Sequence, residues 1–231
     1  MSTSGTYAFS PSSGDMVLQA FRRCGLHRAQ VLSEHILDAY TEANLMLSGW
    51  SAAPGPNWWA TDTVTQLLTS GTDTYTLEAT TLSLIAVYIS TENGDQTNDR
   101  IITPLSSYEY ASLPSKEQPG SPTSYWFNRQ ITPQITLWPV PDDTDTYTLK
   151  IRRWRQLQDT KLPAGSQPDI PWRFQDAFVA GLAARLATIY APDKLAVLGP
   201  QADVAFERAC TNDMEDVNIY FSPGLSYYSQ T

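Results

Sequence analysis

The residues most able to do chemistry are the acids of EHILDAYTE, residues 34–42. Glu34, Asp38 and Glu42 recur every four residues, and His35 stands three residues before Asp38. On a helix this spacing places the acids along one face. Two separated carboxylates are the apparatus of glycoside hydrolysis, so a muralytic enzyme is one interpretation. The other, which we favour, is a solvated acidic face opposite an apolar stripe.

Motifs of the common enzyme classes are absent. The sequence has no GxxxxGK[ST], GxGxxG, GxSxG or HExxH, and His27 and His35 are its only histidines. Cys24 and Cys210 fall in separate helical patterns without CxxC or Cys/His spacing, so we expect buried free thiols, neither a zinc site nor a disulfide framework. We therefore expect no catalytic residue, no metal and no cofactor.

Negative charge is concentrated in one segment. The 231 residues carry 24 acidic and 15 basic side chains, a formal net charge of -9, yet residues 29–99 contain no Lys or Arg. The carboxylates of that segment are Glu34, Asp38, Glu42, Asp62, Asp73, Glu78, Glu92, Asp95 and Asp99. Since Lys and Arg drive binding to nucleic acids, tight binding to DNA or RNA is disfavoured.

The one basic cluster is KIRRWR, residues 150–155. A strand there would carry Lys150, Arg152 and Trp154 on one face and Ile151, Arg153 and Arg155 on the other. A solvated strand end and a phosphate site both fit, and we favour the solvated end. No apolar run approaches the roughly 18 residues of a membrane span, and the first residues lack the regions of a signal peptide. We expect a soluble, unsecreted protein with no membrane partner.

Hydrophobic periodicity predicts helices, then strands, then helices. Ser12 and Asp15 have capping-box spacing for a short helix, and a longer helix follows at about 29–49. Its apolar stripe contains Leu32, Ile36, Ala39, Tyr40, Ala43, Leu47 and Trp50. An alanine-rich helix at 169–191 should pack against it. A last helical region, 193–216, should be split by Gly199 and Pro200.

Between the helices, seven stretches have strand character. They are residues 58–68, 73–78, 82–91, 100–105, 123–128, 134–138 and 146–154, with 82–91 expected to be most central and a short turn or helix at 106–113. The predicted fold class is α+β: a helix bundle formed by the N-terminal and C-terminal helices, with an inserted antiparallel β-sandwich or small barrel.

The predicted domains follow from these elements. They are a flexible N-terminal arm at 1–14, a helical bundle at 15–52 and 170–217, an inserted antiparallel β-domain at 57–160 and an extended C-terminal tail at 218–231. The tail has no regular period but contains Tyr220, Phe221, Leu225, Tyr227 and Tyr228. Such a tail seldom packs alone, so we predict that it docks on another protein or on an adjacent subunit.

Two prolines stand where the strand at 134–138 meets the turn DDTD. Because proline lacks an N–H, Pro139 and Pro141 would stop the strand and blunt a sheet edge. We predict that Pro139, Pro141, Asp142 and Asp143 belong to a hairpin that protrudes toward a neighbour or another protein. The alternative is that these residues simply form a turn that ends the strand.

A series of motifs resembles one family. LQAFRRCGL, ANLMLSGWSA, a Trp-containing strand, DTYTL, LIAVYI, TPLSSYEYASL, GSPTSYWF, ITLWPVPDDTDTYTLKIRRWRQL and LPAGSQPDIPWRFQDAFVAGLAARLATIYA follow in that order over about residues 16–216. This order resembles the head-to-tail adaptors of tailed bacteriophages, the tail accessory factor or connector family. The segment AAPGPNWW, the split last helix and the aromatic tail depart from it.

The resemblance implies a structural virion protein of the head-tail neck, made in the host bacterial cytoplasm. It implies a ring, with twelve copies expected, that docks under the portal protein, extends the channel for genomic DNA and carries the tail nozzle or another tail protein. Under it, Glu34, Asp38 and Glu42 become candidate channel-lining acids and the aromatic tail a candidate portal contact. A carbohydrate-binding or muralytic tail-associated protein is the alternative.

Overall fold

The structure of the chain is a computed structural model that describes residues 5–7, 9–52, 58–93, 96–160 and 165–214. The α-helices are α1 (Ser13–Arg23), α2 (Ser33–Ala52), α3 (Ser107–Ser112), α4 (Gln175–Tyr190) and α5 (Leu195–Asn212). The strands are β1 (Thr61–Leu67), β2 (Thr74–Thr76), β3 (Thr81–Asn93), β4 (Gln96–Ile101), β5 (Thr103–Leu105), β6 (Ser124–Asn128), β7 (Gln134–Trp138) and β8 (Tyr147–Arg155). Single 3-10 turns are η1 (Arg28–Gln30), η2 (Trp58–Ala60), η3 (Trp172–Phe174) and η4 (Pro192–Lys194).

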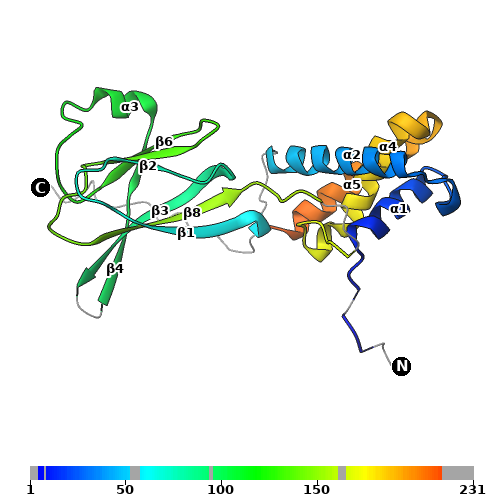
Figure 1. Cartoon of the computed structure of the whole chain (residues 1–231), viewed down its shortest axis with the longest axis horizontal. Helices are drawn as coiled ribbons and strands as arrows, with labels where there is room; N and C mark the ends of the chain where they lie inside the picture. Colours follow the sequence, from blue (N-terminus) through cyan, green and yellow to red (C-terminus); the bar gives the residue numbers. More distant parts are fainter. Residues whose placement is uncertain (1–4, 8, 53–57, 94–95, 161–164, 215–231) are drawn as a thin grey trace, which may run out of the picture.

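The predicted α+β class is confirmed. Two four-stranded sheets, with strand orders β1-β8-β3-β4 and β2-β7-β6-β5, lie between α2 and α4 in the sequence. Figure 1 shows the sheets at one end of the molecule and α1, α2, α4 and α5 at the other. All pairs are antiparallel except β5 with β6, which run parallel. The predicted domain boundaries stay predictions.

The β-domain has its own apolar core, which arises from the two-residue period of its strands. Val87 and Ile89 of β3 and Leu149 and Ile151 of β8 pack with Ile135 of β7 and other buried side chains of the second sheet. Because alternate residues of a strand point to the same face, β3, β7 and β8 each supply every second side chain to this core. The stretch predicted to be most central, β3, does lie inside its sheet, between β8 and β4.

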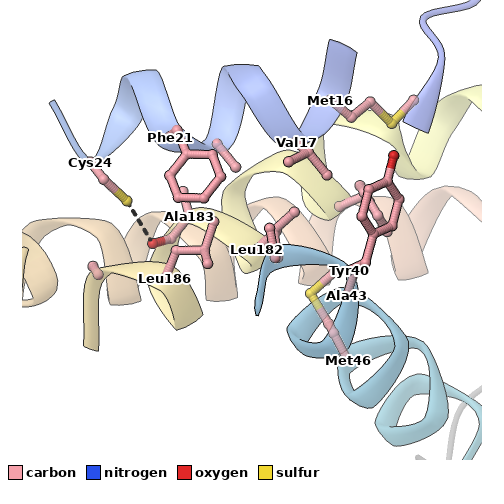
Figure 2. Close-up of a cluster of buried hydrophobic side chains, with 14 of the residues drawn as sticks. Met16, Val17, Phe21, Cys24, Tyr40, Ala43, Met46, Leu182, Ala183 and Leu186 are labelled. Carbon is pink, nitrogen blue, oxygen red and sulfur yellow. Dashed lines mark hydrogen bonds between the residues drawn. The ribbon is translucent and has the colours of Figure 1, made fainter. Parts of the chain in front are cut away.

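The helical core is built around α4. Figure 2 shows Leu182 and Leu186 of α4 facing Val17 and Phe21 of α1, with α2 on the other side. Ser12 caps α1 by accepting a hydrogen bond from the Asp15 N–H at 3.2 Å, which confirms the predicted helix start. The predicted packing of the alanine-rich helix against α2 is also confirmed.

Some predicted details are wrong. The last helix is not split, since α5 runs through Gly199 and Pro200 without a break. An interior proline costs a helix about 3 kcal/mol, and burial of Leu198 and Ala209 offsets this by holding both halves on the core. Leu32 is exposed and precedes α2, so it does not belong to the buried stripe.

The predicted hairpin around Pro139 and Pro141 is also wrong. β7 and β8 do not pair with each other, because they belong to different sheets: β7 lies between β2 and β6, and β8 lies between β1 and β3. The chain beyond Pro139 remains bonded: the Val140 N–H donates to Gln118 O at 2.9 Å, and Pro141 O accepts from the Gly71 N–H at 2.9 Å. Val140 and Pro141 are buried, and only residues 143–146 of this crossing are exposed.

Close approach of α2 and α4 depends on Gly181. A Cβ added at Gly181 would lie 2.7 Å from Met46 Sδ, whereas one added at Gly49 of α2 would meet nothing within 4 Å. We predict that Gly181→Leu lowers the free energy of unfolding by about 1–3 kcal/mol through overpacking. The matched control Gly49→Leu should raise it by up to about 1 kcal/mol, because glycine is a poor helix former. Urea denaturation measures both, and equal effects of the two substitutions would contradict the close contact.

Candidate functional site

The basic cluster of β8 contains a buried cation. The Arg153 side chain is 4% exposed and faces the core side of β8, where it donates to Asp62 Oδ1 of β1 at 2.8 Å. It also donates to Glu78 Oε2 at 2.6 Å and to Thr81 Oγ1 at 2.6 Å. The expected solvated strand end is therefore wrong for Arg153. These three oxygens occupy the donors that a phosphate would need.

The Arg153 network shifts the pKa of Arg153 and of Glu78. The hydrogen bonds that Arg153 donates to Asp62 and Glu78 raise its pKa, although burial acts in the opposite direction. The hydrogen bond from Arg153 in turn holds the pKa of Glu78 below its ordinary value of 4.5. Because Asp62 lies on β1, Glu78 follows β2 and Thr81 begins β3, one guanidinium joins segments of both sheets.

A second cluster joins the β-domain to the helices. Arg155 donates to Asp169 at 2.6 and 3.2 Å, and the Gln158 N–H donates to the same carboxylate at 3.0 Å. Burial acts to raise the pKa of Asp169, but these hydrogen bonds outweigh it and hold that pKa below the ordinary value. Farther on, Asn44 Oδ1 of α2 accepts both the N–H and the hydroxyl of Thr160, each at 2.8 Å.

The structure brings two of the three predicted channel acids to α4. Asp38 accepts a hydrogen bond from the Tyr190 hydroxyl, and Glu42 pairs with Arg185 at 3.3 Å. Burial, and then the bond to Asp38, raises the pKa of Tyr190 to about 12. Glu34 is exposed at the start of α2. All three lie along α2 as the spacing predicted, but their assignment to a channel wall stays a prediction.

Cations from later in the chain neutralise part of the acidic segment. Asp62 and Glu78 pair with Arg153, Glu42 pairs with Arg185, and Asp99 pairs with Lys150 at 2.8 Å. The acidic surplus seen in residues 29–99 therefore does not produce an equally acidic surface, because these partners are distant in sequence but adjacent in the fold.

Two exposed apolar stripes were missed by the sequence analysis. Leu37 and Leu45 point outward from α2, and Val197 and Val204 point outward from α5. Their spacings of eight and seven residues were the available signal, since both correspond to about two helical turns. A groove beside the α5 stripe is lined by Arg23, Asp176, Ala180, Pro200, Gln201, Val204, Ala205 and Arg208.

The other predicted sites have different outcomes. Asp142 accepts from the Tyr147 hydroxyl at 3.0 Å, and Asp143 is exposed in the crossing between sheets. Tyr220, Phe221, Leu225, Tyr227 and Tyr228 lie outside the described residues.

Within the described ranges, Cys24 and Cys210 are free thiols, and no group of three His, Cys, Asp or Glu side chains could hold a metal ion. Every helix there is too short or too polar to cross a membrane.

Comparison with known proteins gives a family match. The family model described as "SU10 adaptor protein" matches residues 17–223. No curated protein matches the chain. A chain from the solved structure titled "Neck of empty GTA particle computed with C6 symmetry" is 13% identical, and the match covers 74% of this chain and 76% of that chain. Its TM-score of 0.26 is too low to support a conclusion about this chain.

The buried guanidinium generates a pH-dependent prediction. Arg153→Met should lower the free energy of unfolding at pH 7 by on the order of 2 kcal/mol, because charge-assisted hydrogen bonds are lost. The pKa of Glu78 is lower in the folded protein than its ordinary value of 4.5. The stability that ionised Glu78 contributes is therefore fully present at pH values above its ordinary pKa, and it is lost as the pH falls through the pKa of the folded state. Denaturation curves should therefore show that the difference in free energy of unfolding between wild type and Arg153→Met becomes smaller below about pH 4.5.

The matched control is Lys150→Met, which removes a more exposed pair with Asp99. Its effect at pH 7 should be clearly smaller than that of Arg153→Met, because water screens exposed ion pairs. Equal losses in the two variants, or a gap that does not change with pH, would argue against a structural role for the Arg153 network.

Proposed function

Because the chain belongs to the SU10 adaptor protein family, we propose that it is a structural, non-enzymatic protein of the neck of a tailed bacteriophage. In this role, copies of the chain form a ring that docks under the portal, extends the DNA channel and presents a platform for tail components. The observation that carries the proposal is the family match over residues 17–223, which includes both the helices and the sheets. Twelve copies are expected from the resemblance of the sequence motifs.

The division of the molecule into two ends suits such a ring. A ring needs two different contact surfaces on every subunit, and an adaptor needs further surfaces for the components above and below it. The helices and the sheets have separate apolar cores and lie at opposite ends of the molecule (Figure 1). One end can therefore serve the portal and the other the tail.

Charge is compatible with passage of a genome. The formal net charge of -9 disfavours retention of DNA by the protein. The most basic stretch, residues 150–155, has Arg153 and Arg155 engaged with Asp62, Glu78 and Asp169. DNA would then slide past the ring without a specific contact.

We propose that the tail, residues 218–231, docks on the portal or on an adjacent subunit. Its large side chains are Tyr220, Phe221, Leu225, Tyr227 and Tyr228. Burial of each would contribute on the order of 1.5–3 kcal/mol before the cost of ordering the segment. Attachment would then depend on these side chains, whereas folding of the rest would not.

The ring is tested by mixing the purified protein with portal protein of the same phage. Negative-stain images and sedimentation should show a ring bound to the portal. A chain that remains monomeric and unattached would contradict the proposal, as would turnover of peptidoglycan or another substrate by the purified protein.

The tail is tested by replacing Tyr220, Phe221, Tyr227 and Tyr228 with serine. Thermal unfolding should be unchanged, and co-sedimentation with the portal should be lost. The control replaces Ser222 and Ser226 with alanine in the same segment and should attach normally. Normal attachment of the tyrosine and phenylalanine variant would contradict docking through the tail.

A further inference from the structure

Helix α2 carries apolar side chains on two opposite sides. Ala39, Ala43 and Met46 are buried against the rest of the helical core. On the outward side, Leu37 and Leu45 are 55% and 54% exposed. Exposed Thr41 and Ser48 lie on the same side, which leaves a shallow stripe of small and apolar residues along the helix. A stripe of this kind on a second side indicates a second partner.

A complementary surface lies on α5 and its neighbours. Val197 and Val204 are 60% and 53% exposed on the side of α5 that faces away from buried Leu198 and Ala209. Beside Val204 lies the groove between α1, α4 and α5, whose apolar lining includes Ala180 and Ala205. The groove is open and shallow enough to receive the side of a helix that has leucines separated by small residues.

The stripe and the groove lie on different sides of the helical bundle. Gly181 of α4 is the point of contact with Met46 of α2, whereas Asp176 and Ala180 of the same helix line the groove. Asp176 and Gly181 are five residues apart, which separates them by about 140° around the helix. Figure 1 shows α2 along one edge of the helical part and α1 along the other. Two such faces meet head to tail between successive copies, as a closed ring requires.

Charge favours this pairing over contact between two identical faces. Glu34 and Asp38 border the α2 stripe, and the partner of Asp38 is the uncharged hydroxyl of Tyr190. Arg23 and Arg208 border the groove. Two α2 stripes in contact would bring these carboxylates together, whereas a stripe in a groove brings carboxylates toward arginines.

Acids also occur near the groove. Arg23 pairs with Asp176 at 2.8 Å, and Asp203 and Glu207 are exposed farther around α5. By helical spacing, Asp203 and Glu207 lie on the side of Val204 opposite to Arg208. The arginine side of the groove is therefore the side that matches the acids of α2.

We propose that the outer face of α2 in one copy packs into the α1–α4–α5 groove of a second copy, with Leu37 and Leu45 against Val204 and Ala205. This contact deepens the ring proposed above and rests on it. It places Glu34 and Asp38 at the seam between subunits, and so replaces the expected assignment of these two acids to the channel wall. Partner-facing small residues, Thr41 and Ser48, permit close approach of the helices.

Disulfide trapping tests the contact. Leu45→Cys and Val204→Cys are combined in a chain carrying Cys210→Ser, with buried Cys24 left in place. Mild oxidation of the assembled protein should give a ladder of cross-linked multimers from the double variant and only monomer from either single variant. A dimer from Leu45→Cys alone would overturn the proposal in favour of contact between identical faces. The control pairs Val204→Cys with Leu67→Cys, since Leu67 is 64% exposed on β1, and should give no ladder.

A charge swap provides a second readout. Glu34→Arg should weaken assembly, measured by sedimentation, and Arg208→Glu in the same chain should restore it. If Arg208→Glu did not restore assembly of the Glu34→Arg variant, charge would not contribute to this contact as proposed. Wild-type protein that forms no ring, alone or with the portal, would refute the proposed function itself. Wild-type rings together with the absence of a ladder would refute only the assignment of these two faces.

Discussion

The antiparallel pairing of β1 with β8 is the constraint on which the rest of the structure depends. β1 follows the helices α1 and α2, and β8 precedes α4 and α5, so the strands are the two connections between the helices and the sheets. Their register places Thr61 opposite Trp154, which brings the two connections side by side. Because the chain leaves the helices and returns to them at neighbouring points, helices on both sides of the insertion can share one core.

Ionic contacts support this arrangement at two levels. Inside the sandwich, Arg153 of β8 reaches Asp62 of β1 and Glu78 beyond β2, so the strand pair is linked to the second sheet. At the junction, Arg155 and Asp169 tie the end of β8 to the segment that leads into α4. A buried guanidinium is costly unless its donors are satisfied, and here the acids and Thr81 satisfy them.

Local patterns in the sequence predicted the helices and strands better than they predicted which of them pair or pack together. The 3.6-residue period located α2 and α4, and strand character located β3 and β6–β8, because these signals arise within each element. The hairpin at Pro139 failed because a turn sequence does not reveal that β7 and β8 belong to different sheets. Burial of Arg153 and the pairing of Glu42 with Arg185 also depend on contacts between residues far apart in sequence. Leu37 and Leu45 fall outside the apolar stripe that the sequence predicted for α2, on the side assigned to solvent, so their exposure on a second face was not predicted.

The strand pair also determines how the molecule responds to mechanical load. Tension between the helices and the far end of the sheets enters through Thr61 and Arg155, which lie at the same end of β1 and β8. While α2 and α4 remain packed, both strands are pulled in the same direction, so β8 must slide along β3 and strain many backbone hydrogen bonds at once. If the helices separated, β1 and β8 would instead be peeled apart one pair at a time. Packing of α2 against α4 therefore sets the direction in which the β1–β8 pair is loaded, along the strands and not across their hydrogen bonds.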